Sequence, residues 1–152
     1  MIFHEKLFYA KTSNWVKIKN FNELAVSQDR KNILLIAEAG LKAIDTNQVL
    51  KNLVKKNGDS LKIGREQFSL EGKKSIIFIG IGKCAVQSGI FFEKILGNYI
   101  TKGIVIDVKS TKKFKKIKSF KGSHPLPSDE NIKVAKEIIS LLQERKEDDF
   151  VI

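Results

Sequence analysis

The sequence has 152 residues, 42% of them hydrophobic, and a formal net charge of +11. This length suits one domain with a buried core. The single cysteine, Cys84, excludes an internal disulfide framework and a cysteine-based zinc cluster, and it fits a reducing, cytoplasmic setting. No apolar run approaches the roughly 20 residues that cross a bilayer, and the N-terminus lacks the continuous apolar stretch of a secretory signal. We therefore expect no membrane association.

The first part of the chain is predicted to be helical. Residues 1–19 show no clean period and are predicted to form an N-terminal extension. Ser27 is the predicted N-cap of a helix that ends near Ile44. Its apolar residues are spaced by three and four, which predicts one buried face: Ile33, Ile36, Ala37, Gly40, Leu41 and Ile44.

A second helix and a strand are predicted next. The helix begins at Asp45 or Thr46 and ends at Asn57–Gly58, where glycine suits a helix stop. Residues 61–70 alternate weakly between apolar and polar, which predicts one strand interrupted at Gly64.

Strands and helices then alternate. Continuous apolar runs predict buried strands over residues 76–79, 103–108 and 117–120, and Phe150–Ile152 reads as the start of another. Helices are predicted over residues 83–96 and from Ser128 to about Arg145. The predicted buried stripe of the last helix is Ile132, Ala135, Ile139 and Leu142.

This order of elements predicts an α/β fold, a three-layer sandwich with a mainly parallel, Rossmann-like sheet preceded by N-terminal helices. Ligands of such sheets bind outside the carboxyl ends of the strands. The last strand stops at Ile152, where its own carboxyl-end loop should begin. We therefore expect residues 20–152 to be an incomplete α/β domain, truncated in its last strand or part of a larger module.

The turn Gly80-Ile81-Gly82-Lys83 follows the first buried strand and opens a helix. Backbone N–H groups, a helix N-terminus and one ammonium group converge there, which suits a phosphate or a carboxylate. Lys83 could also stabilise charge that develops in a transition state. The spacing matches neither a complete Gly-x-Gly-x-x-Gly motif nor a Walker A loop, so a plain tight turn with a solvated lysine stays open. Cys84 is interpreted as a packing residue.

The second candidate segment is Ser123-His124-Pro125-Leu126-Pro127, which holds the only two prolines. Proline restricts the backbone, so the loop is predicted to be rigid and extended, and to face the same crevice as Lys83. His124 could bind a phosphate or orient a hydroxyl group, or it could be a structural histidine that ties down the loop. Asp148 and Asp149 are interpreted as a turn, and no metal-ligating residue is predicted.

The combination of these segments resembles a known family. A strand with Gly-x-Gly-Lys-x-Ala is followed by Gly-Ile-Val-Ile, by His-Pro-Leu-Pro-Ser-Asp-Glu and by Glu-Asp-Asp-Phe-Val-Ile. Together they resemble the N-terminal part of class II glycerate kinases, the glycerate 2-kinase family, over about residues 20–152. In that family a glycine usually precedes the histidine, where this chain has Ser123, and Cys84 replaces a common alanine.

The resemblance implies phosphorylation of D-glycerate at its 2-hydroxyl group, with ATP and Mg²⁺ as cofactors. It implies that Lys83 is catalytic and that Gly80, Gly82, Lys83, Ser123, His124 and Pro125 bind substrate or nucleotide. The family's Ser-Gly-Gly-Gly-Ser loop and second domain do not occur in this sequence. Phosphoryl transfer depends on positioning and electrostatics, so we expect the 152-residue chain to be inactive by itself.

Two other functions stay open. A phosphosugar-binding domain of the sugar-isomerase type also begins with a strand and a Gly-x-Gly-Lys-Ser-like turn, although Cys84 stands where serine is expected. Residues 101–122 hold eight lysines and one acid, a charge that would attract nucleic acid. Only Phe114 and Phe120 lie among these lysines, which offers no stacking platform, so nucleic acid is not the expected partner.

Overall fold

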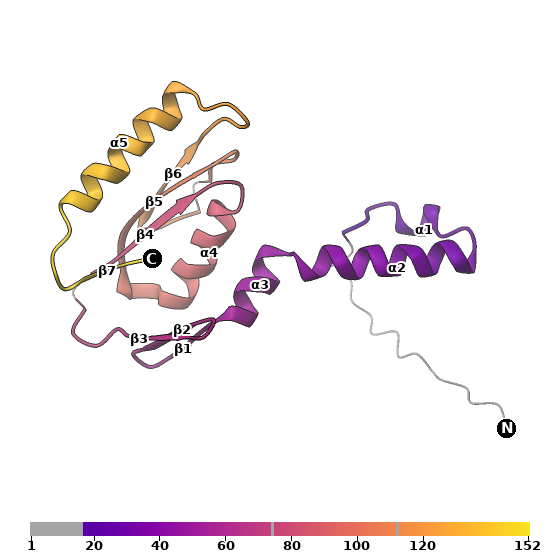
Figure 1. Cartoon of the computed structure of the whole chain (residues 1–152), viewed down its shortest axis with the longest axis horizontal. Coiled ribbons are helices and arrows are strands. Elements are labelled where there is room, and N and C mark those ends of the chain that lie inside the picture. Colours follow the sequence, from indigo (N-terminus) through magenta and orange to yellow (C-terminus); the bar gives the residue numbers. More distant parts are fainter. Residues whose placement is uncertain (1–16, 74, 112) are drawn as a thin grey trace. The chain divides into compact units, whose positions relative to one another are not determined.

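The computed structural model describes residues 17–73, 75–111 and 113–152 (Figure 1). The chain forms two compact units, Met1–Asp45 and Thr46–Ile152. The predicted extension lies outside the described residues up to residue 16. In the part of the chain that the structure describes, no helix has the length and apolar character that a membrane span needs.

The first unit contains α1 (Phe21–Leu24) and α2 (Gln28–Ala43). Ser27 is the N-cap of α2, as predicted, and its side chain accepts a hydrogen bond from the Arg30 N–H at 3.3 Å. The predicted burial of its apolar face is wrong, because Ile33 and Ile36 are 66% and 74% exposed. The described part of this unit offers only the short α1 and the few residues before it as packing partners, so the apolar spacing of α2 does not by itself produce a buried face.

Glu38 is instead the buried residue of α2, at 4% exposure. Its carboxylate accepts hydrogen bonds from the backbone N–H groups of Lys17, at 2.6 Å, and Ile18, at 3.0 Å. The bond from Lys17 is the main cause that lowers the pKa of Glu38 below its ordinary value, and burial opposes it. This carboxylate therefore holds the incoming chain against α2.

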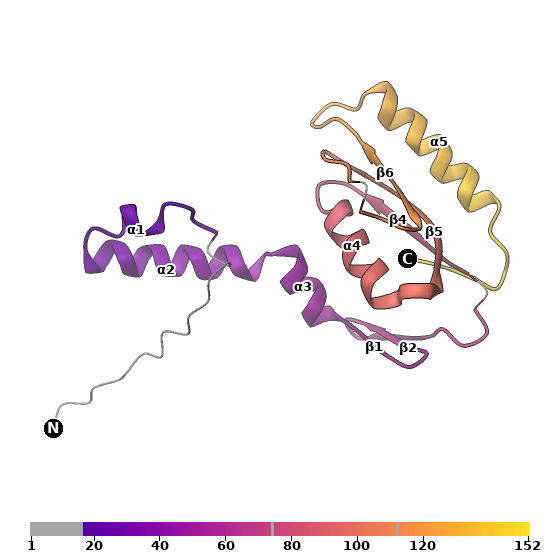
Figure 2. The same ribbon diagram turned by 180° about the vertical axis from the view of Figure 1, so that it is seen from behind.

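The second unit is built on a parallel sheet. It contains β4 (Ser75–Ile81), β5 (Ile100–Asp107), β6 (Ile117–Lys121) and β7 (Asp149–Val151), in the order β6-β5-β4-β7. All neighbouring pairs are parallel. Helix α4 (Ala85–Leu96) lies on one face and α5 (Asp129–Gln143) on the other, as Figures 1 and 2 show, and a short 3₁₀ helix, η1 (Gly97–Tyr99), leads into β5. The predicted three-layer α/β architecture is confirmed.

Alternate residues of the strands face the two helical layers. Phe78 and Val105 pack on the α4 side, and Ile104 and Ile106 pack with α5. The predicted buried stripe of α5 is wrong except for Leu142, which is partly buried and packs against the core. Val134 and Ile138 are buried, whereas Ile132 and Ile139 are 54% and 56% exposed. Two apolar stripes overlap on this helix at similar spacing, and periodicity could not tell which of them faces the sheet.

Residues 46–69, which precede the parallel sheet, form one helix and a small antiparallel sheet. Helix α3 (Thr46–Leu53) ends before β1 (Val54–Asn57), β2 (Ser60–Ile63) and β3 (Glu66–Ser69), so the predicted helix is too long and the predicted single strand is two. Gly58 and Gly64 have φ of +55° and +62° and make the two tight turns. Val54 and Leu61 are buried with the core on the α4 side.

Candidate functional site

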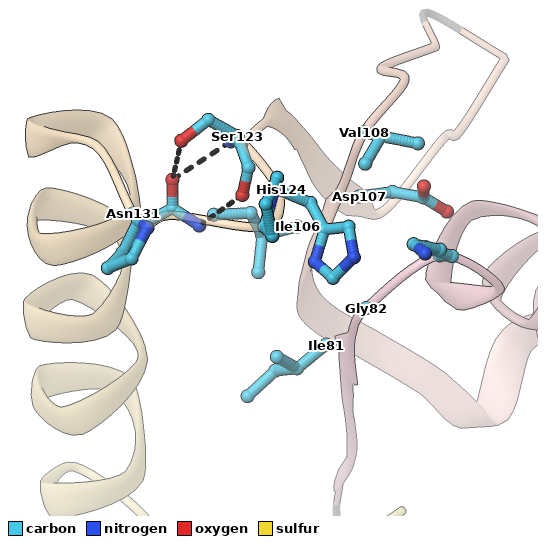
Figure 3. A pocket seen from close by; sticks show the side chains of 12 residues that line it. Ile81, Gly82, Ile106, Asp107, Val108, Ser123, His124 and Asn131 are labelled. Carbon is cyan, nitrogen blue, oxygen red and sulfur yellow. Dashed lines mark hydrogen bonds between the residues drawn. The ribbon is translucent and has the colours of Figure 1, made fainter.

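The carboxyl ends of β4, β5 and β6 surround a cavity of about 240 Å³ (Figure 3). The β4–α4 turn forms one wall, the end of β5 forms the floor, and the loop between β6 and α5 forms the other wall. The lining residues are Ile81, Gly82, Lys83, Ile106, Asp107, Val108, Gly122, Ser123, His124, Pro125, Pro127 and Asn131. Five of the six residues predicted from the sequence, all except Gly80, therefore meet at one cavity.

Two backbone hydrogen bonds, one of them to β5, hold the β4–α4 turn. Gly82 has φ of +111°, a conformation that favours glycine. Its N–H donates to the Ile106 carbonyl oxygen at 2.9 Å, and its carbonyl oxygen accepts from the Ala85 N–H at 3.0 Å. This geometry leaves the Lys83 side chain exposed at the cavity.

Gly80 serves packing. It is buried in β4 and does not line the cavity. A Cβ atom there would lie 2.9 Å from Cγ1 of Val105 and 3.2 Å from Cβ of Ala85. Glycine therefore allows α4 to approach the sheet closely, as the third glycine of dinucleotide-binding turns does.

Asp107 occupies the N-terminal end of α4. This last residue of β5 is 5% exposed, and its Oδ2 accepts a hydrogen bond from the Val86 N–H at 3.1 Å. Cys84, the N-cap residue, makes no side-chain capping bond. A carboxylate of the chain itself thus interacts with the positive end of the helix, where the sequence predicted an external anion.

The opposite wall is held by Asn131, in the first turn of α5. Its Oδ1 accepts hydrogen bonds from the Ser123 N–H at 2.9 Å, the Ser128 N–H at 3.1 Å and the Ser128 hydroxyl at 2.9 Å. The Ser123 hydroxyl donates to the Leu126 carbonyl oxygen at 2.7 Å. Figure 3 shows Ser123 and Asn131 facing one another, and the His124 imidazole on the side of Asp107 and Gly82. The His124–Pro125 peptide bond is cis.

Asn131→Ala should destabilise the second unit by about 1–2 kcal/mol, because two backbone N–H groups and one hydroxyl group lose their acceptor. Chemical denaturation followed by circular dichroism measures this change. Asn98→Ala is the matched control, because its side chain makes no hydrogen bond to a described residue; it should change stability by less than about 0.5 kcal/mol. Equal stability of the two variants would contradict the role of Asn131.

Three polar groups at this cavity have no partner among the described residues. Lys83 makes no ion pair, the His124 ring makes no hydrogen bond, and Oδ1 of Asp107 is buried without a donor. Buried polar atoms are nearly always hydrogen-bonded in folded proteins, so Oδ1 of Asp107 requires a donor that the described residues do not supply. Ser123, Ser128 and Asn131, by contrast, are hydrogen-bonded to one another and hold the loop, so they differ from the three groups that are available to a ligand.

Asp107 and Asn131 were not predicted as site residues. Asp107 directly follows the apolar run of β5, and a polar residue at the carboxyl end of a buried parallel strand is a signal that could have found it. Asn131 lies three residues after the N-cap Ser128, the position from which a side chain reaches back to the cap. His124 and Lys83 were predicted from residue type, but their convergence needed the sheet order.

The residues at this cavity do not form a magnesium site. Within residues 17–73, 75–111 and 113–152, no group of three or more histidine, cysteine, aspartate or glutamate residues could hold a metal ion. Asp107 is the one carboxylate among the described residues that line the cavity, and one of its oxygens already accepts a hydrogen bond from the Val86 N–H. Mg²⁺ usually needs one or two carboxylates together with substrate phosphates.

The lysine-rich segment, residues 101–122, includes most of β5 and the whole edge strand β6, and Lys112 lies outside the described residues. Lys118 lies 4.0 Å from Glu137, and the Lys115 and Lys116 N–H groups both donate to the Glu93 carboxylate. Lysine on an edge strand opposes pairing with another chain. The segment thus has a structural explanation that requires no nucleic acid.

Comparison with known proteins identifies a family and several relatives of this chain. A family model described as "Domain of unknown function (DUF4147)" matches residues 32–152. A protein of Picrophilus torridus named glycerate 2-kinase is 30% identical over 89% of this chain and 31% of its own length. A protein of Pyrococcus horikoshii with the same name is 31% identical over 77% of this chain and 26% of its own length.

A crystal structure of a protein from Pyrococcus horikoshii OT3 superposes with a TM-score of 0.69 and 28% sequence identity, covering 82% of this chain and 28% of that one. The chain spans less than a third of the length of each of these relatives. The predicted resemblance to the N-terminal part of glycerate 2-kinases is confirmed. The chain therefore belongs to the DUF4147 family, a kinase-like family whose two curated relatives here are both named glycerate 2-kinase.

Proposed function

We propose that the cavity binds D-glycerate, the phosphoryl acceptor of an ATP- and Mg²⁺-dependent glycerate 2-kinase to which this chain contributes its N-terminal α/β part. The names of two relatives at about 30% identity support the reaction class. The observation that carries the proposal is the meeting of Lys83, His124 and Asp107, each with a polar group that has no partner among the described residues, at one cavity.

The size of the cavity favours a small ligand. Its volume of about 240 Å³ lies below the roughly 300–1,000 Å³ of pockets that hold drug-sized molecules. A three-carbon hydroxy acid fits this space better than a whole nucleotide. We therefore assign the acceptor to the cavity and assign none of its residues to ATP or Mg²⁺.

Each polar group has a role in this proposal. Lys83 binds the glycerate carboxylate as a point charge and later stabilises negative charge on the transferred group, which makes it the catalytic residue of this wall. The His124 imidazole accepts a hydrogen bond from a hydroxyl group of the substrate or donates one to it. Gly82, Ser123 and Pro125 shape the two walls and contact the ligand at close range. Gly80 has no contact role, because it packs beneath α4.

Nuclear magnetic resonance titration of the 152-residue chain with D-glycerate tests the binding step without requiring turnover. We expect shifts of the Gly82, Lys83 and His124 amides and a dissociation constant that rises about 10–100-fold in Lys83→Met, the range for losing a charge-assisted hydrogen bond. Lys62→Met, on an exposed position of β2, removes the same charge and should bind like the wild type.

Parallel titrations with a sugar phosphate and with a single-stranded oligonucleotide address the other candidate functions. Saturation by the sugar phosphate with no response to D-glycerate would replace the kinase proposal with a phosphosugar-binding domain. Oligonucleotide binding that falls steeply with salt, again without a response to D-glycerate, would indicate nucleic-acid binding through the lysines. A Lys83→Met variant that binds D-glycerate as the wild type does would reject Lys83 as the substrate-binding group.

A further inference from the structure

Asp107 links the two sides of the cavity through one side-chain and one backbone hydrogen bond. The side chain is 5% exposed, and its position is fixed twice: Oδ2 accepts from the Val86 N–H at 3.1 Å, and the backbone carbonyl oxygen accepts from the Gly122 N–H at 2.8 Å. It thus joins the start of α4 to the start of the loop that carries His124. Oδ1 is buried and has no hydrogen-bond partner among the described residues.

This arrangement changes what the start of α4 can bind. A helix N-terminus stabilises a nearby anion, and here the carboxylate of Asp107 is that anion. A phosphate group placed at the same end would meet a buried like charge, in surroundings where charge interactions are stronger than in water. The β4–α4 turn resembles a phosphate cradle in sequence, but the structure places an obstacle to phosphate in it.

Oδ1 of Asp107, which has no donor among the described residues, indicates which ligand group this site binds in place of a phosphate. An ionised carboxylate only accepts hydrogen bonds, so Oδ1 needs a donor. A hydroxyl group supplies a donor without adding charge, whereas a phosphate dianion supplies acceptors alone. Lys83 lines the same cavity and can bind the carboxylate of the ligand.

We propose that Asp107 is a specificity-determining residue that makes this cavity select a free hydroxy acid over its phosphate ester. Oδ1 accepts a hydrogen bond from the 2-hydroxyl group of the free acid, which the phosphate ester lacks. The negative charge of Asp107 repels the phosphorylated form. This inference rests on the proposed binding of D-glycerate, and it adds discrimination between substrate and product. In a kinase this selection would favour release of the phosphorylated product.

Isothermal titration calorimetry on the full chain at neutral pH tests the selection with three probes: D-glycerate, 2-phosphoglycerate and inorganic phosphate. Asp107→Asn removes the charge and keeps an oxygen that can accept from Val86. We expect the ratio of 2-phosphoglycerate affinity to D-glycerate affinity to rise at least about tenfold, with a similar gain for inorganic phosphate. Glu66→Gln, on an exposed position of β3, is the control with the same change in net charge and should leave the ratio unchanged.

The outcomes separate this inference from the proposed function. An unchanged ratio in Asp107→Asn, together with unchanged phosphate affinity, overturns the role of Asp107 even if D-glycerate binds. If the wild-type chain does not bind D-glycerate, the proposed function and the hydroxyl contact are both overturned. The inorganic phosphate titrations of the wild type and of Asp107→Asn then test separately whether Asp107 excludes phosphate. If Asp107→Asn does not fold, the wild-type titrations provide the second measurement: binding of 2-phosphoglycerate as tight as that of D-glycerate overturns the selection.

Discussion

Gly103→Ala is expected to destabilise the second unit by about 3 kcal/mol or more, a large part of the stability of a typical domain. Gly103 lies in β5, and a Cβ atom there would be 2.6 Å from the Phe78 carbonyl oxygen of the paired strand β4. That oxygen belongs to the backbone of the sheet, so relief requires the two central strands to separate. Thermal and chemical denaturation measure the loss.

Gly40→Ala is the control for this substitution. Gly40 lies in α2, where a Cβ atom would meet nothing within 4 Å and where φ is ordinary for a helix. Alanine has the higher helix propensity by about 1 kcal/mol, so this change should be neutral or stabilising. A Gly103→Ala variant as stable as Gly40→Ala would show that the β4–β5 contact yields easily, contrary to the close approach in the structure.

Phe92→Ala should cost about 3–5 kcal/mol, the usual range when a buried phenylalanine is truncated. Phe92 is 6% exposed on α4, and its ring centroid lies 5.3 Å from that of Phe78 and 5.7 Å from that of Phe91. Because α4 begins just after Lys83, loss of this packing should also weaken ligand binding at the cavity. Denaturation and the D-glycerate titration measure the two effects separately.

Ile90→Ala on the same helix is the comparison for Phe92. Ile90 is 39% exposed, and alanine is the better helix former, so its truncation should change stability by less than about 1 kcal/mol. Similar losses in the two variants would mean that α4 does not rest on the sheet through Phe92.

The sequence predicted the parallel sheet because its strands are buried on both faces. Such strands appear as continuous apolar runs, and those of β4, β5 and β6 were found with ends accurate to a few residues. The region of β1, β2 and β3 failed for a local reason. Gly58 was interpreted as a helix stop, whereas its positive φ turns one strand onto the next. A glycine suits the end of a helix and a turn between strands equally well, and only the pairing of β1 with β2 distinguishes the two.

The candidate site was predictable in part. Lys83 and His124 carry distinctive chemistry in short motifs, and the rule that ligands bind at carboxyl ends brought them to one side of the sheet. The sign of the charge at the start of α4 was not predictable, because it depends on Asp107, which is 21 residues from Val86 in sequence. The register of β5 beside β4 brings Asp107 and Val86 together, and this register cannot be predicted from the apolar pattern of the two strands.

The single side-chain oxygen of Asn131 ties the shape of the cavity wall to the first turn of α5. Opening that turn releases the backbone of Ser123, and release of Ser123 frees the segment that carries His124. By thermodynamic linkage, a ligand that binds the ordered wall must also disfavour the opening of the helix. The amides at the start of α5 would then exchange more slowly with solvent deuterium when the cavity is filled, although those amides need not touch the ligand.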